Sequence, residues 1–406
     1  MTAELFPLII ERGCGIDIHR DTAVATIKGK DIVTETQTFN TFTEGIHELI
    51  CWLQNNGVTH VAMESTGVYW KPVYYLMEEY FDMLLVNARH IKNVPGQKTD
   101  KKDSEWIAKL LLSGLLKKSF VPEQKIRDLR TLNRHRKKII SQRTAEKNRL
   151  QNILEEANIK LASVVSDVFG KSAMAMINAI IEGESNPEIL ALLAKGSLTR
   201  KRAELEKALL GNITAHHRFM LKMILENINH INTQIAQLEA QMDKYLTTMQ
   251  QEIELLETIP GVSKGGARGI IAEIGVNMEH FLSHKHLASW AGMCPGNNES
   301  AGKKMSSRTT QGNKYLKSIL VECAWAASRS KTGILLASKH ASIKARRGAK
   351  KASIAVGHKI LIAAYFILRD KIQYQPHVQS QKIADKRKQE RIKRLEKQLK
   401  DLKQTS

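Results

Sequence analysis

Cysteine is scarce in this chain of 406 residues. The four cysteines (Cys14, Cys51, Cys294 and Cys323) are far apart, and no CxxC pair occurs among them. Zinc ribbons depend on such closely spaced pairs, so the sequence disfavours that class of metal site. So few cysteines in so long a chain also disfavour a disulfide framework, which is consistent with a reducing compartment.

Long apolar segments are also absent. The longest uninterrupted apolar run, residues 360–368, is too short to cross a bilayer. The N-terminal sequence Met-Thr-Ala-Glu-Leu-Phe-Pro has no basic residues leading into an apolar stretch, so no signal peptide is expected. These absences predict a soluble, cytoplasmic protein without a membrane partner.

Acidic residues are outnumbered by basic ones. The chain has 62 Lys and Arg against 41 Asp and Glu, a net charge of +21. Such an excess indicates a polyanionic partner, most simply DNA or RNA, although an ordinary basic protein is the alternative. Charge alone does not distinguish DNA, RNA and an acidic membrane surface. At this length, two or three domains are expected.

Residues 1–120 carry alternating strand and helix patterns. The periodicity predicts helices at 43–55, 68–80 and 103–116, and strands at 15–27, 32–39, 58–64 and 83–87. The first two strands are expected to pair as an antiparallel hairpin through residues 28–30. This order predicts an α/β domain with a mixed sheet.

Residues 121–250 are expected to form a helical linker. Long helices are predicted at 122–158, which begins very basic, and at 216–250, where apolar residues recur at coiled-coil-like spacings of three, four and seven. A smaller helical segment separates them. Three arrangements are open: an antiparallel hairpin, a dimerisation element, or the core of a plain helical bundle.

Residues 251–375 form a further unit in this interpretation. It opens with Thr258-Ile259-Pro260-Gly261-Val262 between two helical patterns, which resembles a helix-hairpin-helix. In that motif, backbone N–H groups at the turn hold a DNA phosphate. A glycine-rich turn between core helices would look similar. The remaining residues, 376–406, are a basic tail, either a solvated helix or disordered.

Four acidic residues are the leading candidates for a catalytic site. Asp17 lies inside an apolar strand pattern, and Glu64 ends another. Asp100 and Asp103 are three residues apart at the start of a helical pattern, so they share a helix face. A carboxylate inside an apolar strand is costly unless its charge is compensated. Together they predict a site for two hard cations acting on phosphodiesters.

Each of these acids also has a purely structural interpretation. Asp100 and Asp103 would form a helix N-cap with its capping-box partner. Asp17 would be turn-adjacent or ion-paired, and Glu64 would face solvent at a strand end. His19 and His90, which are near these motifs, are interpreted as structural residues or phosphate contacts rather than ligands.

Ser300 is a second candidate, because it lies in a segment rich in glycine and lysine that is expected to be a flexible loop. A serine hydroxyl needs a base or a metal to become a nucleophile. No GxSxG motif and no Ser-His-Asp order is present, which disfavours hydrolases of that type. From its spacing alone, Ser300 is interpreted as an ordinary loop residue.

Taken together and in order, these motifs resemble the insertion-sequence 110 transposases, a family that includes the Piv-type DNA invertases. The similar segments are Gly15-Ile16-Asp17, Met63-Glu64-Ser65-Thr66-Gly67, Lys98-Thr99-Asp100-Lys101-Lys102-Asp103, Thr258-Ile259-Pro260-Gly261-Val262, Ala288-Ser289-Trp290-Ala291-Gly292-Met293-Cys294-Pro295-Gly296, Ser300-Ala301-Gly302-Lys303 and Gly312-Asn313-Lys314-Tyr315-Leu316-Lys317. The central region and the basic tail match only in character.

The resemblance implies a RuvC-like domain of the ribonuclease H type, a coiled-coil linker and a mainly helical transposase domain. It implies that Asp17, Glu64, Asp100 and Asp103 bind Mg²⁺, or Mn²⁺ in its place, as two ions. It also implies that Ser300 is the nucleophile that attaches to a DNA strand end, supplied by a different protomer.

The implied partners are donor and target double-stranded DNA, a structured noncoding bridge RNA and further copies of the chain, as a dimer assembling to a tetramer in the bacterial cytoplasm. An RNA-guided DNA recombinase is therefore the favoured function. A metal-dependent nuclease for Holliday-type junctions, using the carboxylates alone, is the alternative. A third possibility is a non-enzymatic architectural protein.

Overall fold

The computed structural model describes residues 10–65, 67–87, 100–296, 298–300, 303–306, 308–330 and 333–375, with single positions at 389, 392 and 396. Within these ranges, the side chains of residues 100–102, 298–300 and 303–305 are not described. The basic tail predicted at 376–406 lies outside this part apart from the three single positions. The chain divides into two compact units, residues 1–121 and 122–406.

The first unit contains a five-stranded mixed sheet with the order β3-β2-β1-β4-β5. β1 pairs with β2, and β2 with β3, in antiparallel fashion, whereas β1, β4 and β5 run parallel. The strands are β1 Arg12–Ile18, β2 Thr22–Gly29, β3 Glu35–Asn40, β4 His60–Glu64 and β5 Asp82–Val86. This confirms the predicted mixed α/β domain.

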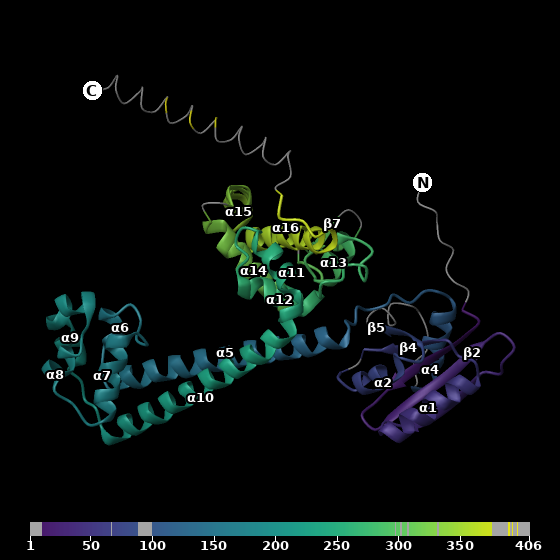
Figure 1. Cartoon of the computed structure of the whole chain (residues 1–406), viewed down its shortest axis with the longest axis horizontal. Coiled ribbons are helices and arrows are strands. Elements are labelled where there is room, and N and C mark those ends of the chain that lie inside the picture. Colours follow the sequence, from purple (N-terminus) through teal and green to yellow (C-terminus); the bar gives the residue numbers. More distant parts are fainter. Residues whose placement is uncertain are drawn as a thin grey trace. The chain divides into compact units, whose positions relative to one another are not determined.

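Helices cover both faces of this sheet. The apolar residues of α1 (Thr43–Asn55) and α2 (Trp70–Met77) form the main core with one face. Helix α4 (Asp100–Leu112) packs its Ile107, Leu110 and Leu111 on the other face (Figure 1). Side chains alternate between the faces along each strand. Helix α1 has the predicted bounds, because its apolar stripe has a clean helical period.

The prediction of a single strand over residues 15–27 is wrong. The chain turns back at His19–Asp21, so that β1 and β2 are antiparallel neighbours with Ile18 opposite Ala23. The His19 backbone N–H donates to the Thr22 carbonyl over 2.9 Å and closes the turn. Arg20 and Asp21 pair with each other in solvent, and the hydrogen bond from Arg20 lowers the pKa of Asp21.

The second unit begins with a pair of long antiparallel helices, α5 (Gln124–Glu156) and α10 (Ala215–Leu246) (Figure 1). Arg136 near the middle of α5 contacts Glu239, and Arg143, further along, contacts Asn232. Residue numbers thus rise on one helix as they fall on the other. Of the three predicted arrangements, the antiparallel hairpin is the one seen within the chain.

Short helices close the end of this pair where α5 finishes and α10 starts. Their apolar side chains share a core with Leu150 and Leu154 of α5 and with Leu221 and Ile224 of α10. The intervening helices are α6 Leu161–Val164, α7 Lys171–Ile181, α8 Pro187–Leu192 and α9 Arg202–Leu209, with a 3₁₀ turn at Gly196–Lys201.

The rest of the second unit is mainly helical and also holds a two-stranded hairpin, β6–β7. Its long central helix α16 contacts α11, α13, α14 and α15. The elements are α11 Gln250–Glu257, α12 Lys264–Ile274, α13 His284–Trp290, β6 Asn298–Ser300, β7 Lys303–Ser306, α14 Lys314–Arg329, α15 Ile334–Arg347 and α16 Ala349–Asp370.

Helix α16 is the one helix in the described part that is long and apolar enough to cross a membrane by length and composition. It extends well beyond the apolar run noted in the sequence. Its residues Val356, Ile360, Leu361 and Ala364 are fully buried against the surrounding helices. Burial in this helical core accounts for its apolar composition.

Helices α11 and α12 and the turn between them have the arrangement predicted for residues 251–275. Ser263 caps α12 by accepting a hydrogen bond from the Gly266 N–H over 3.3 Å. Gly261 has φ +89°, and a Cβ there would lie 2.4 Å from the Ala327 nitrogen of α14. Packing against α14 therefore explains this glycine without a nucleic-acid contact.

All four cysteines are free thiols. Burial raises the pKa of the Cys14 thiol, and it raises the pKa of Cys323 to about 11. These two thiols therefore stay protonated and serve as small core side chains.

Candidate active site

Two of the predicted carboxylates lie in the last two residues of neighbouring parallel strands. Ile16 of β1 lies beside Met63 of β4 in the sheet register, so the next residues, Asp17 and Glu64, lie at the same end of the sheet. Residues directly opposite on paired strands point to the same face. The Asp17 side chain is only 15% exposed, and Glu64 is half-buried. The fold thus brings together two acids that are far apart in the sequence.

Helix α4 crosses the face of the sheet to which these acids belong. A Cβ at Gly15 would lie 2.2 Å from the Ser104 carbonyl oxygen and 2.3 Å from the Ala108 nitrogen. Gly13, two residues earlier in β1, faces Leu111. The helix therefore runs opposite to β1, and its N-terminal turn lies toward the end of β1 that carries the acid.

Buried hydroxyl groups hold α4 in this position. Ser104 Oγ lies 2.7 Å from Thr26 Oγ1, which lies 2.8 Å from Thr36 Oγ1. Both Ser104 and Thr26 are fully buried. At the edge of the contact, Lys28 pairs with Glu105 over 2.8 Å. Because buried hydroxyls are costly unless they are hydrogen-bonded, these linked hydroxyl groups favour one position of α4 on the sheet.

The remaining two predicted acids lie in the first turn of α4. Asp100 is the first residue of the helix, and Asp103 is half-buried. The side chain of Asp100, and all of His90, lie outside the described part. Asp17 Oδ2 lies 3.3 Å from His19 Nε2, a contact that is an ion pair when the histidine is protonated.

Among the side chains that the structure describes, no three His, Cys, Asp or Glu groups form a metal-binding cluster. The four-carboxylate metal site therefore stays a prediction. The residues present suit a magnesium site, because carboxylate oxygens are the ligands that Mg²⁺ prefers.

Replacing Gly15 by alanine should displace α4 from the sheet. The added methyl group would meet helix backbone, which does not move as a flexible side chain does. We expect a loss of roughly 1–3 kcal/mol in the free energy of unfolding, measured by denaturant titration. Gly265→Ala is the control, since the nearest atom there is 3.9 Å away, and it should cost nothing. Equal stability of the two variants would contradict the packing described above.

Ser300 is the last residue of strand β6, which corrects the expectation of a flexible loop. It lies opposite Lys303 of β7 in an antiparallel hairpin, with residues 301–302 connecting the strands. Backbone pairing gives this glycine- and lysine-rich segment a defined conformation, with a shift in register between Asn298 and Glu299. Ser300 is thus placed beside the tip of the hairpin, although its side chain is outside the described part.

The base of this hairpin is tied to the ends of two helices. The Gly296 N–H donates to the Arg308 carbonyl over 2.8 Å, and the Thr310 N–H donates to the Cys294 carbonyl over 3.1 Å. Lys317 of α14 donates from its Nζ to the Gly292 carbonyl over 3.1 Å and also to the Thr309 hydroxyl. The hairpin is therefore positioned by α13 and α14.

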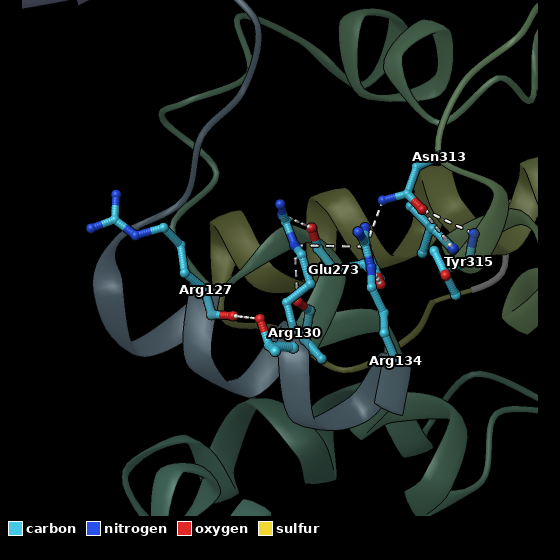
Figure 2. Close-up of polar contacts among 9 residues, drawn as sticks. Arg127, Arg130, Arg134, Glu273, Asn313 and Tyr315 are labelled. Carbon is cyan, nitrogen blue, oxygen red and sulfur yellow. Dashed lines mark hydrogen bonds and ion pairs between the residues drawn. The ribbon is translucent and has the colours of Figure 1, made fainter. Parts of the chain in front are cut away.

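A buried carboxylate, Glu273 near the end of α12, joins α5 to this part of the unit. Its side chain has no solvent exposure and accepts two hydrogen bonds from Arg134, from Nε over 2.9 Å and from Nη2 over 2.7 Å. Arg130 donates to the Glu273 backbone carbonyl over 2.5 Å. Figure 2 shows both arginines extending from α5 toward Glu273, which Asn313 meets from the start of α14. Two parallel hydrogen bonds between a guanidinium and a carboxylate fix the relative orientation of the two groups.

Removing Arg134 should destabilise the second unit strongly. Arg134→Met leaves the Glu273 carboxylate buried with less compensation, and we expect a loss of about 3 kcal/mol in the free energy of unfolding. Arg136→Met is the matched control on the same helix. Its partner Glu239 is 43% exposed, so the loss there should stay below about 1 kcal/mol. Similar losses in thermal or denaturant unfolding would show that Glu273 is not electrostatically dependent on Arg134.

The basic run of α5 is largely engaged within the protein. Its side chains contact α10, α12, α14 and the loop before α7 through Arg130, Arg134, Arg136, Lys137, Arg143 and Lys147. Lys125 and Lys138 are exposed. Much of the positive charge that sequence analysis associated with nucleic acid therefore has a structural role.

Sequence analysis missed the residues that position both candidate sites. Glu273 is the single charged residue in the apolar run Ile270-Ile271-Ala272-Glu273-Ile274, the same signal that drew attention to Asp17. The alternate glycines Gly13 and Gly15 in a strand also indicate a close backbone approach. Ser104 and Thr26 have no comparable signal, because an isolated hydroxyl is common in any element.

Comparison with known protein families covers both candidate sites. A model of the DEDD transposases of the IS110 group, described as transposase, matches residues 14–159. A second model, the transposase IS116/IS110/IS902 family, matches residues 253–338. The first range contains all four acids, and the second contains Ser300, Glu273 and Asn313. This chain belongs to the IS110 family of transposases and recombinases.

Curated relatives of this IS110-family protein agree with that assignment. The pilin gene-inverting protein of Moraxella bovis is 23% identical over 370 residues, which cover 87% of this chain and 95% of the relative. The transposase for insertion sequence element IS1111A of Coxiella burnetii is 22% identical over 285 residues, 68% of each chain. A probable family 20 transposase of Pseudomonas aeruginosa is 22% identical over 274 residues, covering 66% of this chain and 71% of the relative. The family assignment makes this protein a DNA transposase or recombinase.

Proposed function

We propose that this protein cuts and rejoins DNA through a covalent bond between Ser300 and a strand end, assisted by divalent metal ions at Asp17, Glu64, Asp100 and Asp103. The observation that carries the proposal is the meeting of Asp17 and Glu64 at one end of the sheet, toward which the first turn of α4 is directed. The strand order β3-β2-β1-β4-β5, antiparallel then parallel, supports a RuvC-like fold for this unit.

The proposed reaction conserves one phosphodiester for each one broken. Ser300 Oγ loses its proton and attacks the scissile phosphorus, and the bond to the leaving strand oxygen breaks as that oxygen takes up a proton. A hydroxyl of another strand later attacks the phosphoserine ester, which restores the serine, so no ATP is needed. Bound Mg²⁺ or Mn²⁺, as two ions, would stabilise charge on the phosphate oxygens and favour the serine alkoxide.

The partners we propose are donor and target duplex DNA and a structured bridge RNA that selects them by base pairing. Residues 300–369 contain 15 Lys and Arg but a single acid, Glu322, which supports contacts to phosphate backbones. Inside the unit, burial lowers the pKa of His358, and the nearby positive charge of Lys359 lowers it further. Such contacts position nucleic acid without reading its sequence, which suits RNA-guided selection.

A multimeric assembly completes the proposal. The serine and the carboxylates belong to different units of the chain, and we propose that a dimer, assembling to a tetramer, supplies Ser300 from one protomer to the carboxylates of another. The antiparallel pair α5–α10, with its coiled-coil-like spacing, is the element we expect to set the spacing of protomers.

The test is the identity of the residue joined to DNA. Purified protein with its co-purified RNA is incubated with Mg²⁺ and a nicked DNA substrate that traps the intermediate, and the adduct is mapped by mass spectrometry. The proposal expects the nucleotide on Ser300, and sequencing of the bound RNA identifies the guide. Strand cleavage without any adduct would instead favour the metal-dependent junction nuclease.

A further inference from the structure

We propose that Glu273 and Asn313 are positioning residues that hold the serine hairpin in register with helix α5. The inference rests on the proposed function of Ser300, but it concerns residues that make no contact with substrate in that proposal. Its basis is a set of half-buried hydrogen bonds that leads from α5, through Glu273 of α12, to Asn313 at the start of α14 (Figure 2).

The first link connects α5 to α12. Arg134 holds the Glu273 carboxylate with two parallel hydrogen bonds, and its guanidinium lies 4.4 Å from the centre of the Tyr315 ring. Arg130 donates to the backbone carbonyls of Ala272 and Glu273 in the last turn of α12. The planar Arg134 guanidinium and the contacts of Arg130 with carbonyls of α12 together favour one orientation of α12 against α5.

The second link connects α12 to the hairpin through Asn313. Its Nδ2 donates to Glu273 Oε2 over 2.6 Å, while its Oδ1 accepts from the Tyr315 and Leu316 N–H groups and caps α14. Residue 312, directly before it, packs its backbone against Gly292: a Cβ at Gly312 would lie 2.2 Å from the Gly292 nitrogen. Both glycines adjoin the hydrogen bonds that form the hairpin base.

The choice of residues points to positioning rather than stability. Replacing a buried ion pair by apolar side chains of similar volume is often neutral or stabilising, so a charged network is not the simplest way to pack three helices. Directional hydrogen bonds, unlike apolar contacts, specify relative orientation. A displacement of α5 would have to move Glu273, and with it Asn313 and the hairpin base.

Asn313→Asp separates this role from helix capping. Asp and Asn cap helices about equally well, so α14 keeps its cap, but the donor to Glu273 is replaced by a second carboxylate. The matched control is Asn186→Asp. Asn186 caps α8 by accepting from the Glu188 N–H over 2.9 Å, and within the described part of the chain its side chain has no contact with a buried carboxylate. Both variants keep a helix-capping oxygen, but only Asn313→Asp removes a donor to a buried carboxylate.

Two measurements on the full-length protein decide the matter. Hydrogen exchange at the Gly296 and Thr310 amides of the hairpin base should quicken in Asn313→Asp and stay unchanged in Asn186→Asp. Well below the unfolding temperature of either variant, the rate of Ser300 adduct formation should fall by roughly ten- to a hundredfold in the first variant alone, with DNA affinity retained.

Unchanged exchange at the hairpin base in Asn313→Asp would overturn the positioning role. A normal adduct rate with faster exchange would also overturn it, because the hairpin would then tolerate loss of the contact. Absence of a Ser300 adduct in the wild-type protein, with the exchange difference intact, would instead refute the proposed function while leaving the structural coupling in place.

Discussion

Ser300→Ala is expected to abolish the covalent protein–DNA adduct and strand joining while DNA binding persists. The variant lacks the oxygen that the proposed reaction joins to phosphorus, and no other group on the hairpin replaces it in that proposal. Loss of a nucleophile removes at least about a thousandfold in rate. The measurement is adduct formation on a nicked substrate, resolved on a denaturing gel, beside a mobility-shift titration for binding.

Ser306→Ala is the matched control for this variant. Ser306 lies on β7 of the same hairpin, where its Oγ accepts from the Arg308 N–H over 3.2 Å. Its replacement removes the same atoms without the proposed nucleophile, so the adduct should form at close to the normal rate. If Ser300→Ala still recombines DNA, the serine assignment is wrong. If it cuts without joining, the metal-dependent nuclease becomes the better description.

Asp17→Asn is expected to abolish cutting and joining while leaving the fold and DNA binding intact. An amide keeps the shape of the side chain but loses the negative charge that a divalent cation needs. Even changes to outer partners of metal ligands lower affinity or activity by roughly 10–100-fold, so a proposed direct ligand should cost more. Cleavage rates measured against Mg²⁺ concentration would show this loss, and circular dichroism would confirm the fold.

Asp21→Asn gives the comparison for Asp17. Asp21 lies four residues away in the β1–β2 turn, is 71% exposed and pairs with Arg20, so its loss should leave cleavage unchanged. Normal cleavage by Asp17→Asn would remove this residue from the catalytic site. The non-enzymatic architectural protein would be the better description if the unaltered protein binds DNA without cutting it and Asp17→Asn binds equally well.

Local patterns in the sequence predicted the elements whose signals are periodic. The apolar stripe of residues 43–55 predicted α1 with its observed bounds, and long helices were predicted where α5 and α10 lie. The strand over residues 15–27 was wrong because two apolar strands joined by a three-residue turn resemble one strand when only composition is considered. For Ser300, a short glycine- and lysine-rich hairpin was mistaken for a loop, since its order comes from pairing with β7.

The same difference between local signals and long-range contacts separates the residues of the candidate sites. Asp17, Glu64, Asp100, Asp103 and Ser300 were identified because each stands out from its neighbours or belongs to a recognisable motif. The residues that position them were not, because Ser104 meets Thr26, and Asn313 meets Glu273, across 78 and 40 residues of sequence. Such pairings depend on chain topology, and the local sequence around either residue does not predict which residue it will contact.

The sequence by itself determined the chemical groups available to this protein and its family: four acids in an α/β context, a serine in a basic segment, and an excess of cations. Only the tertiary structure decided that β1 and β4 are parallel neighbours, which brings Asp17 and Glu64 to one end of the sheet. It also decided that a buried carboxylate on α12 joins α5 to Asn313 at the start of α14. The physical reason is that side-chain chemistry is local, whereas strand register and the partners of buried charges are set by long-range packing.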